Sequence, residues 1–357
     1  ISVPYNVPLH QVRVLLNDDV DVTAMFRTDA AARTMRGVVT GLAVGTNTLI
    51  ADSNGIGNGR PRASLTITNY PIGGPVLLGS QTQPWVCATP TREIDPVTGA
   101  TTNASGLSTY AVDAQCNIAT EYKLFYRTTN SPCSSSLPYP CPPAAPRAHA
   151  CFKPYTVGVT PPDLAMTTST NGTTVPYIVR VERGTINRGI YDIATLFDPT
   201  SETPWTALSP QPQWNRKVVY TFGASTGQPR LQFRTEQNWA DDAALSRGFI
   251  VVDNSLTDSL YNSNRTLNAE TLMMMKEHVV DSYGEIASTI GNGCSGGSIQ
   301  QNTAASIYPG LLDGIQPSCD YPDSITTGLE VGDCVLLVNF YAGPEWTALM
   351  AGKTQAE

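Results

Sequence analysis

The residues with the clearest potential for chemistry are 293–297, which read Gly-Cys-Ser-Gly-Gly and place Ser295 between glycines. This is the G-x-S-x-G pattern of a nucleophile held on a sharp turn between a strand and a helix. Glycines suit such a turn because bulky neighbours would clash there. The sequence predicts a strand before the turn (286–290) and a helix after it (298–307). Ser295 is therefore the candidate nucleophile of an acyl-transfer reaction.

Acyl transfer also needs backbone N–H groups that stabilise a developing oxyanion. The amide of Gly296, at the start of the predicted helix, is the first candidate. The second is expected from the loop after an earlier strand. A buried strand is predicted at 217–222, and residues 223–227 after it read Gly-Ala-Ser-Thr-Gly. Gly223 and Ala224 are thus candidate donors, and an ordinary strand-to-helix turn is the alternative.

The general base is the missing part of this constellation. In an α/β-hydrolase the order along the chain is Ser, acid, His, and no histidine follows Ser295. His10 falls in the predicted N-terminal β region and His149 in a Cys/Pro-rich stretch. His278 falls on the helix before the nucleophile strand, where we expect a packing role. We therefore predict that the histidine lies beyond Glu357, in a second polypeptide made by cleavage or in residues absent from this chain.

The acid has one candidate within the chain. Asp320 follows the predicted strand 311–315, and some hydrolases place their acid after the strand that follows the nucleophile. A turn or lid-anchor role for Asp320 is the alternative, with the true acid further on.

Composition excludes several classes of function. The net charge is −8 and no cluster of Lys and Arg is present, so nucleic-acid binding is not expected. Apolar runs such as 335–338 are far shorter than a membrane span, and no membrane association is expected. Hydrophobic residues make up 41% of the chain and charged residues 15%, as in a globular protein with a lightly charged surface.

The eight cysteines indicate export. None forms a C-x-x-C pair and only three histidines are present, so no zinc or other metal site is expected, and the predicted chemistry needs no cofactor. An even set of disulfides predicts a secreted or periplasmic protein. The first residues have no signal-peptide character, which fits a mature end. The cysteines are Cys87, Cys116, Cys133, Cys141, Cys151, Cys294, Cys319 and Cys334.

The chain divides into three parts by pattern. Short β-branched segments separated by turn residues predict an immunoglobulin-like β-sandwich at 1–75. Residues 76–205 read as a Cys/Pro-rich connection that leads into the hydrolase domain. Residues 206–357 alternate strands and helices, which predicts the parallel sheet of an α/β-hydrolase, incomplete in this chain. The last residues, 334–357, are expected to begin a helical lid.

Residues 273–323 resemble a bacterial family of secreted hydrolases that carries a domain of unknown function. The resemblance is strongest at 291–301, which reads Gly-Asn-Gly-Cys-Ser-Gly-Gly-Ser-Ile-Gln-Gln, and continues at 308–314, Tyr-Pro-Gly-Leu-Leu-Asp-Gly. The N-terminal region and Gly-Gly-Pro at 73–75 are similar as well. The resemblance implies the fold and the nucleophile and leaves the substrate undefined.

A more distant similarity is to tannases and feruloyl esterases, which share the Gly-Cys-Ser-x-Gly-Gly turn. In those enzymes the cysteine before the nucleophile is joined by a disulfide to one beside the catalytic histidine. The resemblance thus implies that Cys294 is a structural clamp, with a partner outside this chain or among its other seven cysteines.

These observations predict a secreted serine hydrolase that cleaves a carboxylic ester, either an aromatic ester or a polyester oligomer, through an acyl-enzyme on Ser295. Its partners would be that small or oligomeric substrate and the second polypeptide. Two alternatives remain. A chymotrypsin-like protease would use His149, Asp192 and Ser295, although the helical patterns fit that largely β fold poorly. A non-catalytic extracellular binding protein is the other.

Overall fold

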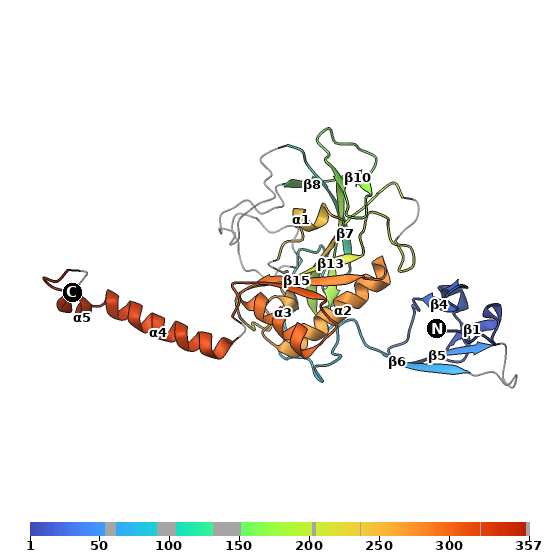
Figure 1. Cartoon of the computed structure of the whole chain (residues 1–357), viewed down its shortest axis with the longest axis horizontal. Coiled ribbons are helices and arrows are strands. Elements are labelled where there is room, and N and C mark those ends of the chain that lie inside the picture. The colour runs from blue at the N-terminus through green and yellow to red at the C-terminus, as the bar shows by residue number, and fades with distance from the viewer. Residues whose placement is uncertain are drawn as a thin grey trace.

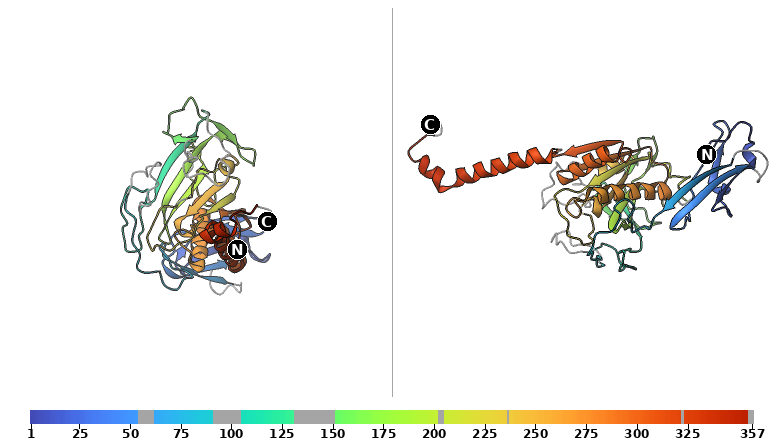
Figure 2. Two further views of the ribbon diagram at one scale, coloured as in Figure 1. Left: turned by 90° about the vertical axis from the view of Figure 1, so that its left-hand side faces the viewer. Right: turned by 90° about the horizontal axis from the view of Figure 1, so that it is seen from below.

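The computed structural model describes residues 1–53, 62–90, 105–130, 151–201, 205–235, 237–321 and 323–354. These residues form an N-terminal β unit, a central body built on one large sheet, and a long C-terminal helix that projects from the body at the end opposite the N-terminal unit (Figures 1 and 2). A disulfide joins Cys87 to Cys116 in the segment that leads into the body.

The N-terminal unit is built from short antiparallel strands. A four-stranded sheet has the order β2-β1-β5-β6, and a separate pair is formed by β3 and β4. Val12, Phe26 and Met35 pack between the sheet and the pair. The predicted immunoglobulin-like sandwich is not confirmed, since the described residues place one sheet beside one hairpin. The bounds are β1 (Val12–Leu16), β2 (Val20–Asp21), β3 (Phe26–Asp29), β4 (Thr34–Gly37), β5 (Gly45–Ser53) and β6 (Ala63–Asn69).

The body is organised by an eight-stranded mixed sheet of order β16-β15-β13-β14-β12-β11-β7-β8. Strands β13 to β16 are mutually parallel, and the other four pair in antiparallel fashion. A two-residue turn with positive φ at Asn187 and Arg188 joins β11 to β12, the geometry favoured by tight hairpins. The bounds are β7 (Glu121–Arg127), β8 (Phe152–Pro154), β11 (Ile178–Ile186), β12 (Gly189–Leu196), β13 (Lys217–Phe222), β14 (Ile250–Asn254), β15 (Ser288–Cys294) and β16 (Gly314–Ser318); β9 (Met166–Thr168) and β10 (Thr174–Pro176) form a separate pair.

This sheet crosses the domain boundary that the sequence predicts near residue 205. Strands β7, β8, β11 and β12 come from the expected connecting region, and β12 pairs directly with β14. The connecting region therefore supplies half of the sheet, and the two expected parts share one core. The turn residues and prolines around these strands predict an irregular connection. The pairing of the strands with distant segments cannot be predicted from local sequence patterns.

Helices cover both faces of the sheet, and the alternation of side chains along β13 shows how. Val218, Tyr220 and Phe222 point to the face covered by α2 (Arg265–Tyr283) and α3 (Gly296–Ile307), whereas Val219 points to the opposite face, near α1 (Asp242–Leu245). Both faces of the sheet are therefore covered and excluded from water along β13, as is usual for a central parallel sheet.

Apolar residues at 272, 275, 279 and 283 have the spacing that predicts one buried face on a helix, and the structure confirms this for α2. Leu272, Met275, Val279 and Tyr283 are all buried on one face of the helix. The sequence also offers Asn268 as the N-cap of this helix, and that prediction is wrong. Asn264 caps the helix by accepting a hydrogen bond from the amide of Leu267 at 3.0 Å, and Asn268 lies inside the first turns.

The C-terminal helix α4 (Ser324–Ala342) begins ten residues before the expected lid at Cys334 and is followed by α5 (Pro344–Leu349). Within α4, the window Ile325–Ala342 has a mean hydropathy of 1.2 and is long and apolar enough to cross a membrane, and none of that window is buried. The expectation that apolar runs fall short of a membrane span does not hold for this helix. A core helix of a soluble protein passes the same test, so length and composition alone do not assign α4 to a membrane.

Candidate functional site

Ser295 lies at the turn between β15 and α3, in a backbone conformation that non-glycine residues rarely adopt. Its φ is 55° and its ψ is −118°. Such a conformation costs on the order of 1–3 kcal/mol and persists only where the surroundings hold it. The amide of Ser295 donates to the carbonyl of Ser318 at 2.9 Å, and its carbonyl accepts from the amide and hydroxyl of Ser298 at 2.9 and 2.7 Å. Strand β16 and the first turn of α3 therefore hold the turn.

Two glycines allow the loop after β13 to pass over the start of α3. A Cβ on Gly296 would lie 1.9 Å from the carbonyl oxygen of Ser225, and a Cβ on Gly297 would lie 2.5 Å from that of Phe222. Neither position leaves room for a side chain, because the obstructing atoms belong to the backbone. The loop at 223–227 thus lies beside the nucleophile turn, as the sequence predicts.

The amide groups near Ser295 differ in their availability as oxyanion donors. Gly296 is the first residue of α3, whose first N–H groups have no partner within the helix. The amide of Gly223, in contrast, donates to the carbonyl of Thr257 at 3.2 Å, and its carbonyl accepts from the amide of Ser259 at 3.1 Å. The prediction of Gly223 as an oxyanion donor is therefore corrected. Its N–H is already bonded to the segment that follows β14 and is not available to a substrate oxyanion. Ala224 is the next amide of the loop and remains the candidate.

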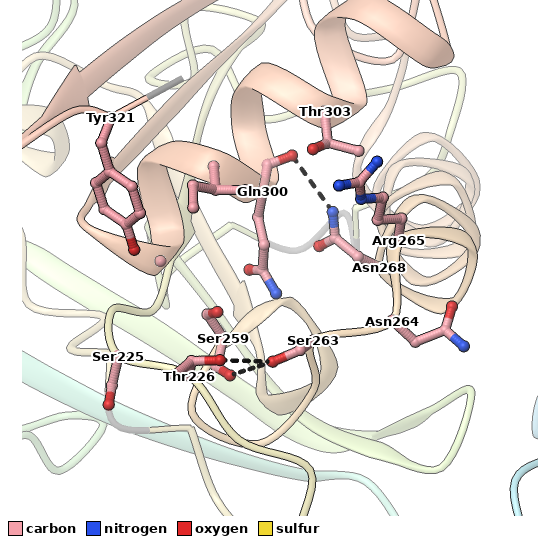
Figure 3. A pocket seen from close by; sticks show the side chains of 12 residues that line it. Ser225, Thr226, Ser259, Ser263, Asn264, Arg265, Asn268, Gln300, Thr303 and Tyr321 are labelled. Carbon is pink, nitrogen blue, oxygen red and sulfur yellow. Dashed lines mark hydrogen bonds between the residues drawn. The ribbon is translucent and has the colours of Figure 1, made fainter. Parts of the chain in front are cut away.

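A pocket of about 220 Å³ opens beside this turn (Figure 3). Gly296 and Ile299 of α3 line it on one side, and the loops after β13 and β14 line it on the other. Asn264, Asn268 and Gln300 contribute amide side chains, and Arg265 contributes a guanidinium group. Six hydroxyl groups complete the lining, those of Ser225, Thr226, Ser259, Ser263, Thr303 and Tyr321.

A family model covers the whole of this chain. It describes a tannase-like family of unknown function (DUF6351), and it matches residues 1–357.

The chain belongs to this tannase-like family.

No curated protein sequence matches the chain. Among solved structures it is similar to oligopeptidase B from Leishmania major, with 14% identity and a TM-score of 0.26, over 46% of this chain and 21% of that one. It is also similar to a post-proline cleaving enzyme from Rickettsia typhi, with 10% identity and a TM-score of 0.24, over 43% and 20% of the two chains. The aligned part spans about a fifth of each of those peptidases.

The described histidines of this tannase-like chain lie away from Ser295. His10 is exposed in the N-terminal unit. His278 lies on α2 and bonds through Nε2 to Glu182 of β11 at 2.6 Å, and β11 is four strands from β15 in the sheet order. With strands about 4.8 Å apart, that separation is roughly 19 Å. His149 lies outside the described residues. The structure thus places neither described histidine as a base for Ser295.

The two candidate acids have different surroundings. Asp320 follows β16, at the same edge of the sheet as Ser295, and accepts a hydrogen bond from Asn302 at 2.9 Å in an exposed position. Asp192 is buried on β12, where it pairs with Arg183. Three strand spacings, roughly 14 Å, separate β12 from β15. The chymotrypsin-like triad is therefore not assembled: its aspartate is distant and the sheet around Ser295 is parallel.

Cys294, directly before the nucleophile, lies beside Cys319. In the register of β15 and β16, Cys294 is opposite Ser318, so Cys319 is the next residue along. The pKa of the Cys319 thiol is raised, chiefly by a hydrogen bond with the Cys294 side chain. The negative charge of a Cys294 thiolate is the second cause. The family resemblance implies a disulfide from Cys294 to a cysteine beside the catalytic histidine, whereas the structure places Cys319 next to Cys294 without a disulfide between them. That neighbour follows β16 and lies beside Asp320.

A buried carboxylate that the sequence analysis did not single out links α2 to the sheet. Glu182 is 1% exposed and accepts hydrogen bonds from Tyr191 at 2.6 Å, from His278 and from Tyr283. Burial by itself raises the pKa of Glu182, but the bonds and charge of its neighbours outweigh burial and hold the pKa below its ordinary value. In the sequence, the only sign of this site is a glutamate within a strand, and that position does not predict which side chains bond to it.

Proposed function

We propose that this chain is the nucleophile-bearing part of a serine hydrolase that cleaves carboxylic esters through an acyl-enzyme on Ser295. The observation that supports this most directly is the strained turn at Ser295, which lies between a parallel strand and a helix N-terminus. Strain at a serine in this position is typical of a nucleophile, since it exposes the hydroxyl beside helix amides. The tannase-like family supports a hydrolase, and the ester specificity and export belong to the proposal.

The reaction would proceed in two steps. The Ser295 hydroxyl loses its proton to a general base and attacks the ester carbonyl, and the amides of Gly296 and Ala224 stabilise the oxyanion. The alcohol leaves with that proton, and Ser295 retains the acyl group. Water then attacks the acyl-enzyme, assisted by the same base, and releases the acid.

The base is proposed to come from residues that the structure does not describe. Strand β16 is last in the sheet order, so one edge of the parallel sheet is open to a further strand. Helix α4 exposes apolar side chains such as Leu336 and Val338, at 69% and 58%, which a further layer could cover as a lid. Both features support an α/β-hydrolase domain that a second polypeptide, or further chain, completes.

A fluorophosphonate probe followed by peptide mapping tests the nucleophile. Such probes label activated serines, so we expect modification of the native protein at Ser295. Ser295→Ala should lose labelling and reduce ester hydrolysis by about 10⁴- to 10⁶-fold. Ser306→Ala is the matched control, because Ser306 lies on the exposed part of α3. Labelling elsewhere, or none at all, would favour a non-catalytic binding protein.

The source of the base has its own test. Intact-mass analysis of the active native protein, under reducing and non-reducing conditions, should reveal a second polypeptide or a longer chain. A single active species of 38.2 kDa whose activity disappears in His149→Ala would instead assign the base to His149.

A further inference from the structure

The proposed reaction makes no use of two thiols that lie in contact beside the nucleophile, those of Cys294 and Cys319. Cys294 directly precedes Ser295, and Cys319 directly precedes Asp320. Their side chains form a hydrogen bond to each other across the ends of β15 and β16. Two thiols in contact can be joined by oxidation, so this pair carries a chemistry of its own.

The backbone at the two strand ends suits a disulfide. Cys294 lies opposite Ser318 in the register, so Cys319 is its diagonal neighbour. With strands about 4.8 Å apart and a rise of about 3.3 Å per residue, a diagonal pair of Cα atoms is about 6 Å apart, within the range of about 4.4–6.8 Å that a disulfide spans. The amide of Ser295 donates to the carbonyl of Ser318 at 2.9 Å, so the strands remain paired up to these cysteines. The two sulfur atoms can therefore bond without a movement of the strands.

The two thiols differ in their access to solvent. Cys319 is exposed, whereas Cys294 is 8% exposed. A dissolved oxidant therefore reaches Cys319, while Cys294 is shielded from it. An exposed thiol that captures an oxidant and a buried thiol beside it are the two parts of a disulfide-forming pair, in which the second thiol resolves the mixed disulfide.

The two other thiols among the described residues lie elsewhere. Cys151 is buried in the core on the face of the sheet opposite α2 and α3. Cys334 is exposed on α4, which projects from the body (Figure 1). Within the described chain, Cys319 is therefore the partner that the fold offers to Cys294.

We propose that Cys319 and Cys294 are a redox-active pair, in which Cys319 captures a low-molecular-weight disulfide and Cys294 resolves it to an intrachain disulfide. This bond differs from the one that the family resemblance implies, because its second cysteine follows β16 and precedes Asp320, whereas the implied one lies beside a histidine. The proposal does not rest on the esterase activity, since thiol exchange needs neither Ser295 nor a general base.

The exchange balances with oxidised glutathione as the oxidant. The Cys319 thiolate attacks one sulfur of glutathione disulfide, and one glutathione leaves as its thiolate and takes up a proton. The Cys294 thiol loses its proton, its sulfur attacks the sulfur of Cys319, and the second glutathione leaves in the same way. The protein gives up two electrons and two protons, and one glutathione disulfide becomes two thiols.

The bond would fasten the turn that presents the nucleophile. In the reduced protein, hydrogen bonds link this turn to β16, among them the one from the hydroxyl of Ser318 to the carbonyl of Gly293 at 3.4 Å. A covalent link between Cys294 and Cys319 holds the same two segments and closes a loop that contains all of α3. Because such a loop also restricts the unfolded chain, we expect the oxidised protein to melt about 5 °C or more above the reduced protein.

Peptide mapping after thiol exchange tests the pair. The native protein is incubated with oxidised glutathione, the remaining thiols are alkylated, and the digest is analysed by mass spectrometry. We expect the peptides of Cys294 and Cys319 to be linked. Cys294→Ser should trap glutathione on Cys319, and Cys319→Ser should leave Cys294 as an unmodified thiol. Cys334→Ser is the matched control, because it removes the other exposed thiol of the described residues, and it should form the link as the unmodified protein does.

Several outcomes would overturn the proposal. They are a native protein in which Cys294 is linked to a different cysteine, a glutathione adduct that remains on Cys319 while Cys294 is intact, and an oxidised protein that melts at the same temperature as the reduced one. The unmodified protein gives these answers alone, so the test survives a variant that does not fold. Ester hydrolysis is not the readout. Failure of the thiol pair therefore leaves the proposed esterase standing, and absence of probe labelling at Ser295 leaves the pair standing.

Discussion

Helices α3 and α4 follow one another along the chain, and β16 lies between them, yet their surroundings are opposite. In α3, Gln301 and Ala304 are fully buried, and the backbone of Gly296 and Gly297 touches the loop after β13. In α4, a Cβ on Gly332 would meet nothing within 4 Å. Both segments are helical, but α3 is packed against the sheet and the neighbouring loop, whereas α4 exposes most of its side chains. A packed helix such as α3 can hold catalytic groups in fixed positions, whereas the exposed apolar side chains of α4 are free to contact another surface.

Glycine substitutions in the two helices test this difference in packing most directly. Gly296→Ala pushes a methyl group into the carbonyl of Ser225. The overpacking should cost about 1–3 kcal/mol of unfolding free energy, and the shifted loop should lower ester hydrolysis by about 100-fold. Thermal melts and kcat/KM values provide the measurement.

Gly332→Ala is the matched control for that substitution. Replacing glycine in a helix interior favours the helix by up to about 1 kcal/mol, so the melting temperature of the body and the activity should both be unchanged. A similar loss in the two variants would mean that α4 is also held by contacts.

A second test concerns α2, which is joined to the sheet by the Glu182 cluster, formed by Glu182, Tyr191, His278 and Tyr283. The ionised form of Glu182 is favoured in the folded protein, because its pKa is below the ordinary value of about 4.3. It therefore stabilises the fold above that pH, and the contribution is lost as the pH falls through the lowered pKa. Glu182→Gln should cost about 1–3 kcal/mol at pH 7. Its melting temperature should also fall less than that of the unmodified protein between pH 5 and 3.

Tyr283→Phe provides a graded control for the cluster. It removes one hydrogen bond to the carboxylate and keeps the ring packed against Trp205. An intermediate pH dependence is expected. Identical pH profiles in all three proteins would show that Glu182 does not contribute to acid stability.

The smallest effect is expected on α4 itself. Leu336 is 69% exposed, so Leu336→Lys should change the unfolding free energy of the body by less than about 0.5 kcal/mol. It should reduce self-association in analytical ultracentrifugation, because a charge interrupts the apolar surface. Leu272→Ala on the buried face of α2 should instead cost about 2–5 kcal/mol. Comparable costs at the two leucines would contradict the exposed position of α4.

The sequence predicted the elements that carry strong local signals. Strand β13 is found at its predicted residues, and α3 follows the nucleophile turn as expected. The glycines around Ser295 predicted the turn because few other residues tolerate such close backbone contact. The apolar stripe of α2 could also be predicted from the sequence, because apolar residues that recur with a period of 3.6 mark one buried face of a helix.

Only the tertiary structure decided which distant segments meet. The pairing of β12 with β14 joined a region that looked like a connection to the central sheet, and the bond from Gly223 to Thr257 removed a predicted oxyanion donor. The neighbourhood of Cys294 and Cys319 follows from the register of two parallel strands. Residue types and their spacing determine local conformation and the chemistry that a side chain can perform. The partners of each polar group depend on contacts between residues far apart in the chain, as the bonds from Tyr191, His278 and Tyr283 to Glu182 show.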